Sequence, residues 1–160
     1  MRKWIWVIAL SFLAVAAQAD WRLQEVQDFS AVAKQAKAKN VPLVIYFTRE
    51  RCPPCVRFEE NALLPMVENG LVDGYIEIVE LQADADDKVI DFDGYEVSRS
   101  EIAELYNVTT FPRLVFVNAQ GRELGIRMEN SGAYDYFPYY FKQRINQALE
   151  KLGNAKRIAE

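Results

Sequence analysis

Two cysteines separated by two prolines follow closely on an uninterrupted apolar segment. Residues 43–47 have the β-branched and aromatic pattern of a strand that is buried on both faces. The motif Cys52-Pro53-Pro54-Cys55 comes shortly after it. Proline is tolerated in the first turn of a helix because its missing N–H has no partner within the helix there. The sequence therefore predicts a central strand that leads into a helix opened by the cysteines.

The position of the first cysteine favours a nucleophilic role. A thiol at a helix N-terminus faces unpaired N–H groups and the positive end of the helix dipole, which lowers its pKa from about 8.5 toward neutrality. Arg49 and Arg51 add positive potential, which Glu50 partly offsets. We expect Cys52, open to solvent at the helix tip, to attack a substrate disulfide and Cys55, one turn inside, to resolve the mixed disulfide.

Other uses of the cysteine pair stay open. An inert disulfide across so short a loop would stabilise the fold by only about 2 kcal/mol. Haem attachment requires a histidine after the second cysteine, where this sequence has Val56, and the chain contains no histidine. A metal site would have two sulfurs but no histidine and only three methionines in the chain to add. The absence of histidine also excludes histidine-based catalytic triads.

The N-terminal segment has the order of a secretory signal. Arg2 and Lys3 precede an apolar run, and Ala17-Gln18-Ala19 is a small-residue cleavage site. We expect a signal peptide over residues 1–19, cleaved after Ala19; an uncleaved membrane anchor is the alternative. Cleavage removes two positive charges, so the net charge changes from −4 to −6. The mature protein is therefore expected to be acidic, soluble, free of stable membrane insertion and located outside the reducing cytoplasm.

Composition and charge bound the remaining chain. A chain of 160 residues with 51% hydrophobic residues is long enough for one well-cored domain and too short for two. Acidic and basic residues are interspersed, whereas nucleic-acid binders concentrate lysine and arginine on one face. We expect a single domain over residues 20–160 with no nucleic-acid partner.

Hydrophobic spacing and capping patterns place the other elements. The acidic stretch over residues 84–97 is expected to be a surface insertion, and Ser98 with Glu101 forms a capping-box pattern that begins the next helix. The helix that begins at the cysteines is expected to be kinked or split near Pro65. We predict helices over residues 29–39, 98–106 and 135–152, a strand over 75–81, and a hairpin of strands over 113–117 and 122–128.

This order of elements implies an α/β fold with a central mixed β-sheet flanked by helices. The chain resembles the thioredoxin family, more narrowly secreted bacterial thioredoxin-related proteins of the SoxW type. The resemblance covers residues 24–152 and is carried by the apolar strand, the Cys-Pro-Pro-Cys motif, the insertion with Phe92-Asp93-Gly94, the helix over 101–106 and Thr110-Phe111-Pro112. It implies a thioredoxin fold with an acidic insertion before the third helix.

The resemblance also implies a substrate-binding loop. In the family, the proline at the position of Pro112 is cis and lies against the cysteine pair, and the residue before it, here Phe111, offers backbone groups to an extended substrate. An ordinary trans proline at a strand start is the alternative. We expect Pro53, Pro54 and Arg51 to contact substrate as well, with Arg51 in place of the family's tryptophan.

Two positions near the motif depart from thioredoxin. The buried aspartate that thioredoxin carries six residues before its first cysteine is replaced here by Tyr46, which is a poor base at neutral pH. In the similar C-terminal domain of the membrane thiol reductase DsbD, a glutamate stands four residues after the second cysteine, where this chain has Glu59. We expect Glu59 to accept the Cys55 proton, directly or through water. A solvated helix carboxylate is the alternative.

The prolines and the resemblance together predict the direction of reaction. Each proline removes an N–H that could stabilise the Cys52 thiolate, so we expect a reduction potential nearer to the roughly −270 mV of thioredoxin than to the roughly −120 mV of DsbA. The sequence thus predicts a periplasmic thiol-disulfide oxidoreductase that reduces protein disulfides, needs no cofactor or metal and receives electrons from a DsbD-like membrane thiol reductase. A dithiol oxidase or isomerase, and a non-catalytic metal or apocytochrome chaperone, are the alternatives.

Overall fold

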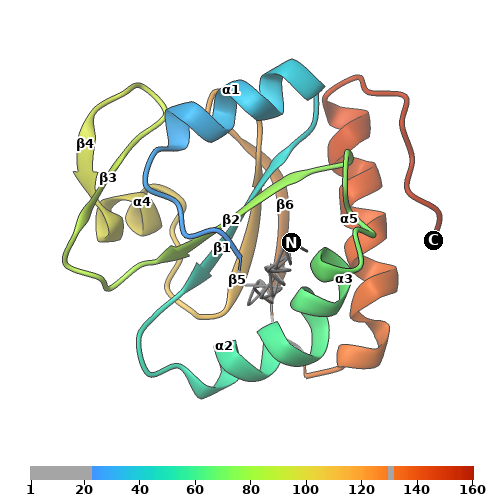
Figure 1. Ribbon diagram of the computed structural model, residues 1–160, viewed down its shortest axis with the longest axis horizontal. Helices are drawn as coiled ribbons and strands as arrows, with labels where there is room; N and C mark the ends of the chain where they lie inside the picture. Colours follow the sequence, from blue (N-terminus) through green and yellow to red (C-terminus); the bar gives the residue numbers. More distant parts are fainter. Residues whose placement is uncertain (1–22, 130–131) are drawn as a thin grey trace, which may run out of the picture.

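The apolar run predicted to be a central strand lies in the middle of the sheet. A computed structural model describes residues 23–129 and 132–160, so the segment expected to be a signal peptide lies outside the described residues. All six residues of β1 (Leu43–Thr48) are buried. The sheet has the order β2-β1-β5-β6 (Figure 1). β1 is parallel to β2 (Glu77–Gln82) and antiparallel to β5 (Arg113–Val117), which forms the predicted hairpin with β6 (Glu123–Glu129).

Helices cover both faces of this mixed sheet (Figure 1). None of them, within the described part of the chain, is long and apolar enough to cross a membrane. They are α1 (Phe29–Lys39), α2 (Pro53–Phe58), the π-helix η1 (Glu59–Leu63), α3 (Leu64–Glu68), α4 (Arg99–Leu105), the 3₁₀ turn η2 (Tyr134–Tyr136) and α5 (Phe137–Lys151).

Aromatic contacts fix which helix covers which face. On one face, Phe58 of α2 contacts Tyr46 of β1 at a ring-centroid distance of 5.9 Å and Phe137 of α5 at 5.0 Å. On the other face, Phe47 of β1 contacts Tyr106 at the end of α4 at 6.0 Å. Adjacent residues of β1 point to opposite faces, so this one strand anchors both helical layers.

The cysteine helix is continuous but changes its winding near Pro65. The N–H of Leu64 donates to the carbonyl of Glu59, a wide turn that belongs to the π-helix η1. Pro65 has no N–H to donate, and its ring crowds the carbonyl of Asn61 four residues before it. The wider turn accommodates the proline, which confirms the predicted irregularity and gives its form.

The acidic stretch over residues 84–97 is more than a surface insertion. It contains the hairpin of β3 (Lys88–Ile90) and β4 (Glu96–Ser98). Val89 is buried, the N–H of Ile90 donates to the carbonyl of Gln27 at 2.9 Å, and Phe92 stacks on Phe29 at 5.0 Å. The stretch is the predicted insertion at the surface, but a few apolar side chains among its charges also dock it, as a hairpin, on the start of α1.

Side-chain caps fix where two helices begin. The side chain of Asp28 accepts a hydrogen bond from the N–H of Ala31 at 3.0 Å and starts α1. Ser98 and Glu101 form the predicted capping box at the start of α4. The last helix is shorter than predicted, because the 3₁₀ turn η2 includes the first two predicted residues, Asp135 and Tyr136, and α5 runs from Phe137 to Lys151.

Candidate active site

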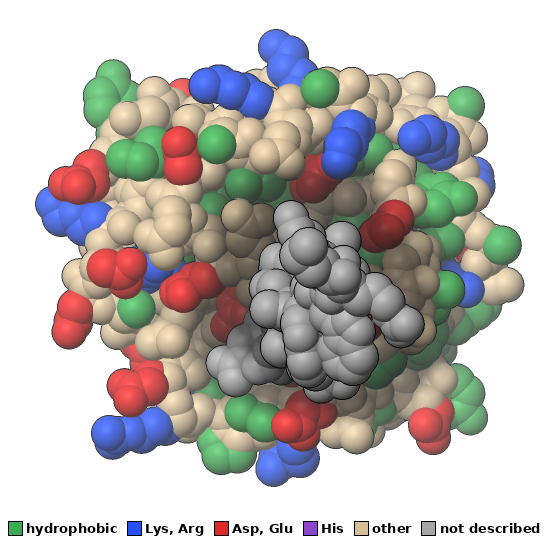
Figure 2. All heavy atoms as spheres, viewed as in Figure 1, with side chains coloured by type: hydrophobic (Ala, Val, Ile, Leu, Met, Phe, Trp, Pro, Cys, Tyr) green, Lys and Arg blue, Asp and Glu red, His purple; other side chains and the backbone are tan. Residues whose placement is uncertain are grey.

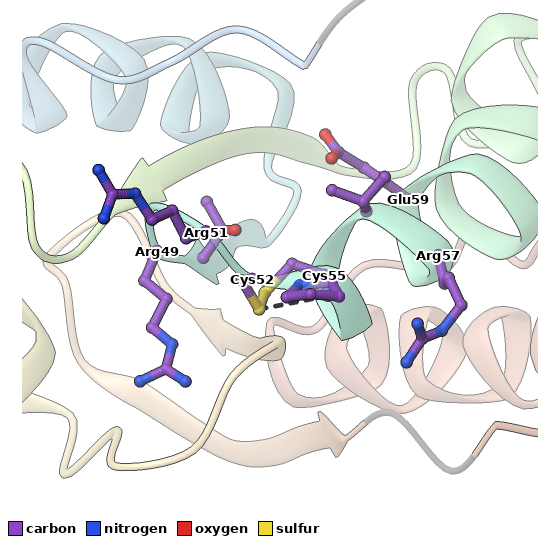
Figure 3. Close-up of a pocket in the computed structure, with 9 residues that line it drawn as sticks. Arg49, Arg51, Cys52, Cys55, Arg57 and Glu59 are labelled. Atoms are coloured by element: carbon purple, nitrogen blue, oxygen red, sulfur yellow. Dashed lines mark hydrogen bonds between the residues drawn. A yellow bond between two sulfur atoms is a disulfide. The ribbon is translucent and has the colours of Figure 1, made fainter.

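The two cysteines form a disulfide at the start of α2, at the carboxyl end of β1. The sulfur atoms are 2.03 Å apart and the Cα atoms 5.2 Å apart. Cys52 is the N-cap of α2, and its Sγ accepts a hydrogen bond from the N–H of Cys55 at 3.3 Å (Figure 3). The predicted placement of Cys52 at the helix N-terminus, with Cys55 one turn inside, is confirmed.

The two prolines of the motif leave one backbone N–H that can donate to the sulfur of Cys52. Pro53 and Pro54 occupy the first two positions of α2 and have no N–H. An N-cap side chain accepts hydrogen bonds from the N–H groups of the second or third helical residue. The second is Pro54, so the amide of Cys55 is the donor that remains for Cys52.

Neither cysteine is open to solvent in the disulfide form. Cys52 is 4% exposed and Cys55 is 2% exposed, which corrects the expectation of an exposed sulfur at the helix tip. The disulfide holds each short side chain against the other. Both cysteines line a pocket of about 530 Å³, through which a substrate would approach them. The pocket is lined by Thr48, Arg49, Arg51, Cys52, Pro53, Cys55, Val56, Arg57 and Glu59.

Arginine side chains surround this pocket. Figure 3 places Arg49 and Arg57 on opposite sides of the disulfide, whereas the guanidinium of Arg51 extends away from that of Arg49. Arg51 has a left-handed backbone conformation (φ 53°), its side chain is 90% exposed, and its Nε lies 3.6 Å from a carboxylate oxygen of Glu50. The structure therefore places Arg51, an expected substrate contact, at the rim of the pocket.

The loop before β5 reaches the same end of the sheet. The Phe111–Pro112 peptide bond is cis, as the family resemblance implied. Arg113 pairs with Phe47 near the end of β1, and the guanidinium carbon of Arg49 lies 5.8 Å from the ring centroid of Phe111. Phe111 and Pro112 are not among the described residues that line the pocket, so the loop is beside it.

Tyr46 lies beneath the second cysteine. Its side chain is fully buried, and its hydroxyl donates to the carbonyl oxygen of Cys55 at 3.3 Å. Burial raises the pKa of Tyr46 above its ordinary value, and the negative charges of Glu59 and Glu80 raise it further. Tyr46 therefore stays protonated at neutral pH and acts as a hydrogen-bond donor.

Glu59 stands one helical turn after Cys55, at the junction of α2 and η1. Its N–H donates to the carbonyl of Cys55, and its side chain is half-buried at the pocket. Its carboxylate extends away from the sulfur pair (Figure 3). Its negative charge is one of the causes that raise the pKa of Tyr46.

Three pocket residues were missed from the sequence: Thr48, Val56 and Arg57. Arg57 and Val56 follow the motif directly, and Val56 is 50% exposed despite its apolar side chain. The spacing could have predicted Arg57, because residues four apart lie on the same side of a helix. Arg57 follows Pro53 by four residues, so it is expected on the side of α2 that carries Pro53. Pro54, predicted to contact substrate, is half-buried and is not among the described pocket residues.

The wider surface does not extend this positive charge. On the face seen in Figure 2, lysine and arginine side chains are dispersed among aspartates and glutamates. Within the described residues, no three histidine, cysteine, aspartate or glutamate side chains are grouped so that they could hold a metal ion.

Comparisons with known proteins agree with this geometry. A sequence profile described as a thioredoxin-like domain matches residues 29–149, and no curated protein matches the chain. A solved structure described as DsbH oxidoreductase is similar with a TM-score of 0.58 and 19% identity, over 78% of this chain and 85% of that one. A thioredoxin-fold protein from Helicobacter pylori is similar with a TM-score of 0.51 and 16% identity, over 73% of this chain and 74% of that one. These likenesses establish the thioredoxin fold.

Proposed function

This chain belongs to the family of thioredoxin-like domains, and from that premise we propose that it works mainly as a reductase of protein disulfides. Its fold and its close Cys52–Cys55 pair are those of a thiol-disulfide oxidoreductase. The observation that carries the proposal is the disulfide at the N-terminus of α2, where the Cys55 amide donates to the Cys52 sulfur.

The reaction moves two electrons from the protein to its substrate. The Cys52 thiolate attacks one sulfur of the substrate disulfide, forms a mixed disulfide and releases the other sulfur as a thiolate. Cys55 then loses its proton and attacks Cys52, which releases the second substrate thiolate and leaves the Cys52–Cys55 disulfide. A thiol donor must reduce this disulfide before the next cycle.

The reducing direction is supported by the small number of donors around Cys52. A thiolate that accepts fewer hydrogen bonds is less stabilised, so its dithiol form gives up electrons more readily. Among the backbone groups of the described residues, the Cys55 amide is the donor that the structure shows at the Cys52 sulfur, because Pro54 lacks the N–H that the second helical residue would supply.

Equilibration with a series of glutathione ratios tests this direction. We expect a potential nearer to about −270 mV than to about −120 mV. Pro54→Ala restores one donor and should raise the potential by about 30–65 mV, since a hydrogen bond to a charged group contributes about 1.5–3 kcal/mol. Pro53→Ala is the matched control, because the N–H of the first helical residue is not one that an N-cap side chain accepts; the expectation that each proline removes a donor to Cys52 therefore holds for Pro54 alone. A wild-type potential near that of DsbA would instead favour a dithiol oxidase.

Glu59 is proposed to accept the proton of Cys55 during resolution, directly or through a bridging water. Its position one turn after Cys55 and its electrostatic interaction with Tyr46 support this role. Because its carboxylate extends away from the sulfurs, transfer through water is the simpler route.

Substrate contacts are proposed for two residues of the loop before β5, Phe111 and Pro112. They are also proposed for three residues at the start of α2, namely Arg51, Pro53 and Pro54. The guanidinium of Arg49 over the Phe111 ring supports this, because it connects that loop to the pocket rim. An extended substrate segment would lie between the loop and the helix start.

The proposed site of action is the bacterial periplasm, with a DsbD-like membrane thiol reductase as electron donor. The predicted signal over residues 1–19 supports export. Expression of the full chain in a bacterium, followed by mass measurement of the periplasmic fraction, should give a protein that begins at Asp20. A protein that keeps Met1 in the cytoplasm would contradict this location. Loss of its reduced form on deletion of the membrane reductase would test the donor.

A further inference from the structure

We propose that the disulfide pocket selects substrates whose disulfide lies in an acidic peptide segment, with Arg49 and Arg57 as the residues that recognise the acidic side chains. The inference rests on the proposed reductase function and names the class of substrate. It concerns selection among disulfides and adds no new reaction.

Position is the first reason. Arg49 follows β1 and Arg57 lies in the second turn of α2, and both side chains line the pocket that contains the disulfide. Figure 3 shows the disulfide between these two arginines, which extend on opposite sides of it. A peptide that presents its disulfide to Cys52 therefore passes one arginine on each side.

Available charge is the second reason. Within residues 23–129 and 132–160, neither Arg49 nor Arg57 forms an ion pair, and the Arg49 guanidinium lies over the ring of Phe111. Arg51, by contrast, lies 3.6 Å from Glu50. The carboxylate of Glu59 extends away from the sulfurs. The described lining of the pocket therefore carries two arginines without an ion-pair partner against one carboxylate, that of Glu59, although the whole chain has 23 acidic and 19 basic residues.

The chemistry of the rim fits a peptide. A guanidinium binds a carboxylate through two parallel hydrogen bonds, and opposite charges around a cleft increase the rate of encounter. Val56, half-exposed, and Pro53 line the same pocket and supply apolar contact surface. This combination suits a polypeptide that carries aspartate or glutamate on both sides of its cysteine.

Single-turnover kinetics with the reduced full chain test the inference. The probes are three symmetrical peptide disulfides that differ only in the residues on either side of cysteine: aspartate, serine or lysine. Each turnover converts one protein dithiol and one peptide disulfide into one protein disulfide and two peptide thiols, which are quantified by mass spectrometry. At low ionic strength we expect the acidic peptide to react about tenfold faster than the lysine peptide, with the ratio falling toward one at high salt.

Variants assign the effect to the two arginines. Arg49→Gln and Arg57→Gln should each lower the acidic-to-basic rate ratio, and the double variant should bring it close to one. The ratio cancels any change in the reactivity of Cys52 that is common to all three peptides. Arg144→Gln is the matched control, because Arg144 is exposed on α5 away from the pocket residues and should leave the ratio unchanged.

The outcomes separate the inference from the function on which it rests. Equal rates for the acidic and lysine peptides in the wild-type protein would overturn the inference alone. A charge preference that survives in the double arginine variant would also overturn it. Failure to reduce any of the three peptides would overturn the proposed reductase function together with the inference.

Discussion

The carbonyl oxygen of Cys55 connects α2 to the central strand β1 by a hydrogen bond. It accepts hydrogen bonds from the buried hydroxyl of Tyr46 and from the N–H of Glu59. The hydroxyl holds the helix above β1, and Glu59 is the residue that we propose to take up the Cys55 proton. At the scale of single residues, the proposed function thus divides positioning and proton transfer between two side chains.

The proposed role of Glu59 predicts that its loss slows one step of the reaction, the resolution of the mixed disulfide by Cys55. Glu59→Gln should slow resolution of the mixed disulfide at neutral pH by about a hundredfold or more, because a general base is lost. Single-turnover measurement of product release across pH checks this, and the rate of the variant should rise as hydroxide replaces the base. Glu60→Gln, on the exposed neighbour, is the control. Equal rates for Glu59→Gln and the wild type would remove the proposed role.

The role of Tyr46 predicts an effect on stability. Tyr46→Phe removes a buried hydrogen bond and should lower the free energy of unfolding at neutral pH by about 1 kcal/mol. The raised pKa of Tyr46 means that, above pH ~10, the unfolded chain loses this proton while the folded chain keeps it, so stability falls as pH rises. The variant should lose less stability over this range.

Urea unfolding at neutral pH and above pH ~10 measures both effects of Tyr46→Phe. Tyr95→Phe is the matched control, because this tyrosine is 70% exposed and its hydroxyl is already in water. A Tyr46→Phe protein as stable as the control at neutral pH would show that the hydroxyl does not stabilise the helix position.

Two contacts between secondary-structure elements support the fold around the site. The π-helix η1 joins α2 to α3 and places Glu59 immediately after the first helical turns. On the opposite face of the sheet, the turn after β5 packs on the inserted hairpin, where Gly121 lies against Phe92 and the Tyr106 hydroxyl donates to the Gly121 carbonyl at 2.6 Å. The insertion is therefore part of the folded core on that face.

Gly121 gives a test at this scale. It has a φ of 72°, and a Cβ there would lie 2.6 Å from the ring of Phe92, so Gly121→Ala should lower the free energy of unfolding by about 3 kcal/mol. Gly74→Ala is matched in backbone, with φ 74°, but has no atom within 4 Å, and should cost about 1 kcal/mol. Equal costs in thermal or urea unfolding would contradict the docking of the insertion.

At the scale of the whole molecule, local patterns predicted the frame. The strand over β1, the helix at residues 29–39 and the Ser98–Glu101 cap follow from spacing and capping, which depend on neighbouring residues. The burial of Cys52 and the approach of Arg49 to Phe111 depend on segments far apart in the chain, so no local pattern contained them. The docking of the insertion through Phe92 also depends on a residue far away in the chain, Phe29, so the charged residues around Phe92 gave no sign of it.

Trapping of the mixed disulfide tests the central claim, that Cys52 attacks and Cys55 resolves, most directly. The Cys55→Ser protein, incubated with a peptide disulfide, should accumulate a stable adduct of one peptide linked to Cys52, located by mass spectrometry. Cys52→Ser should accumulate much less, because Cys55 lies one turn inside α2, whereas Cys52 is at its N-cap. No adduct on Cys55→Ser, or equal adducts on both variants, would contradict the account.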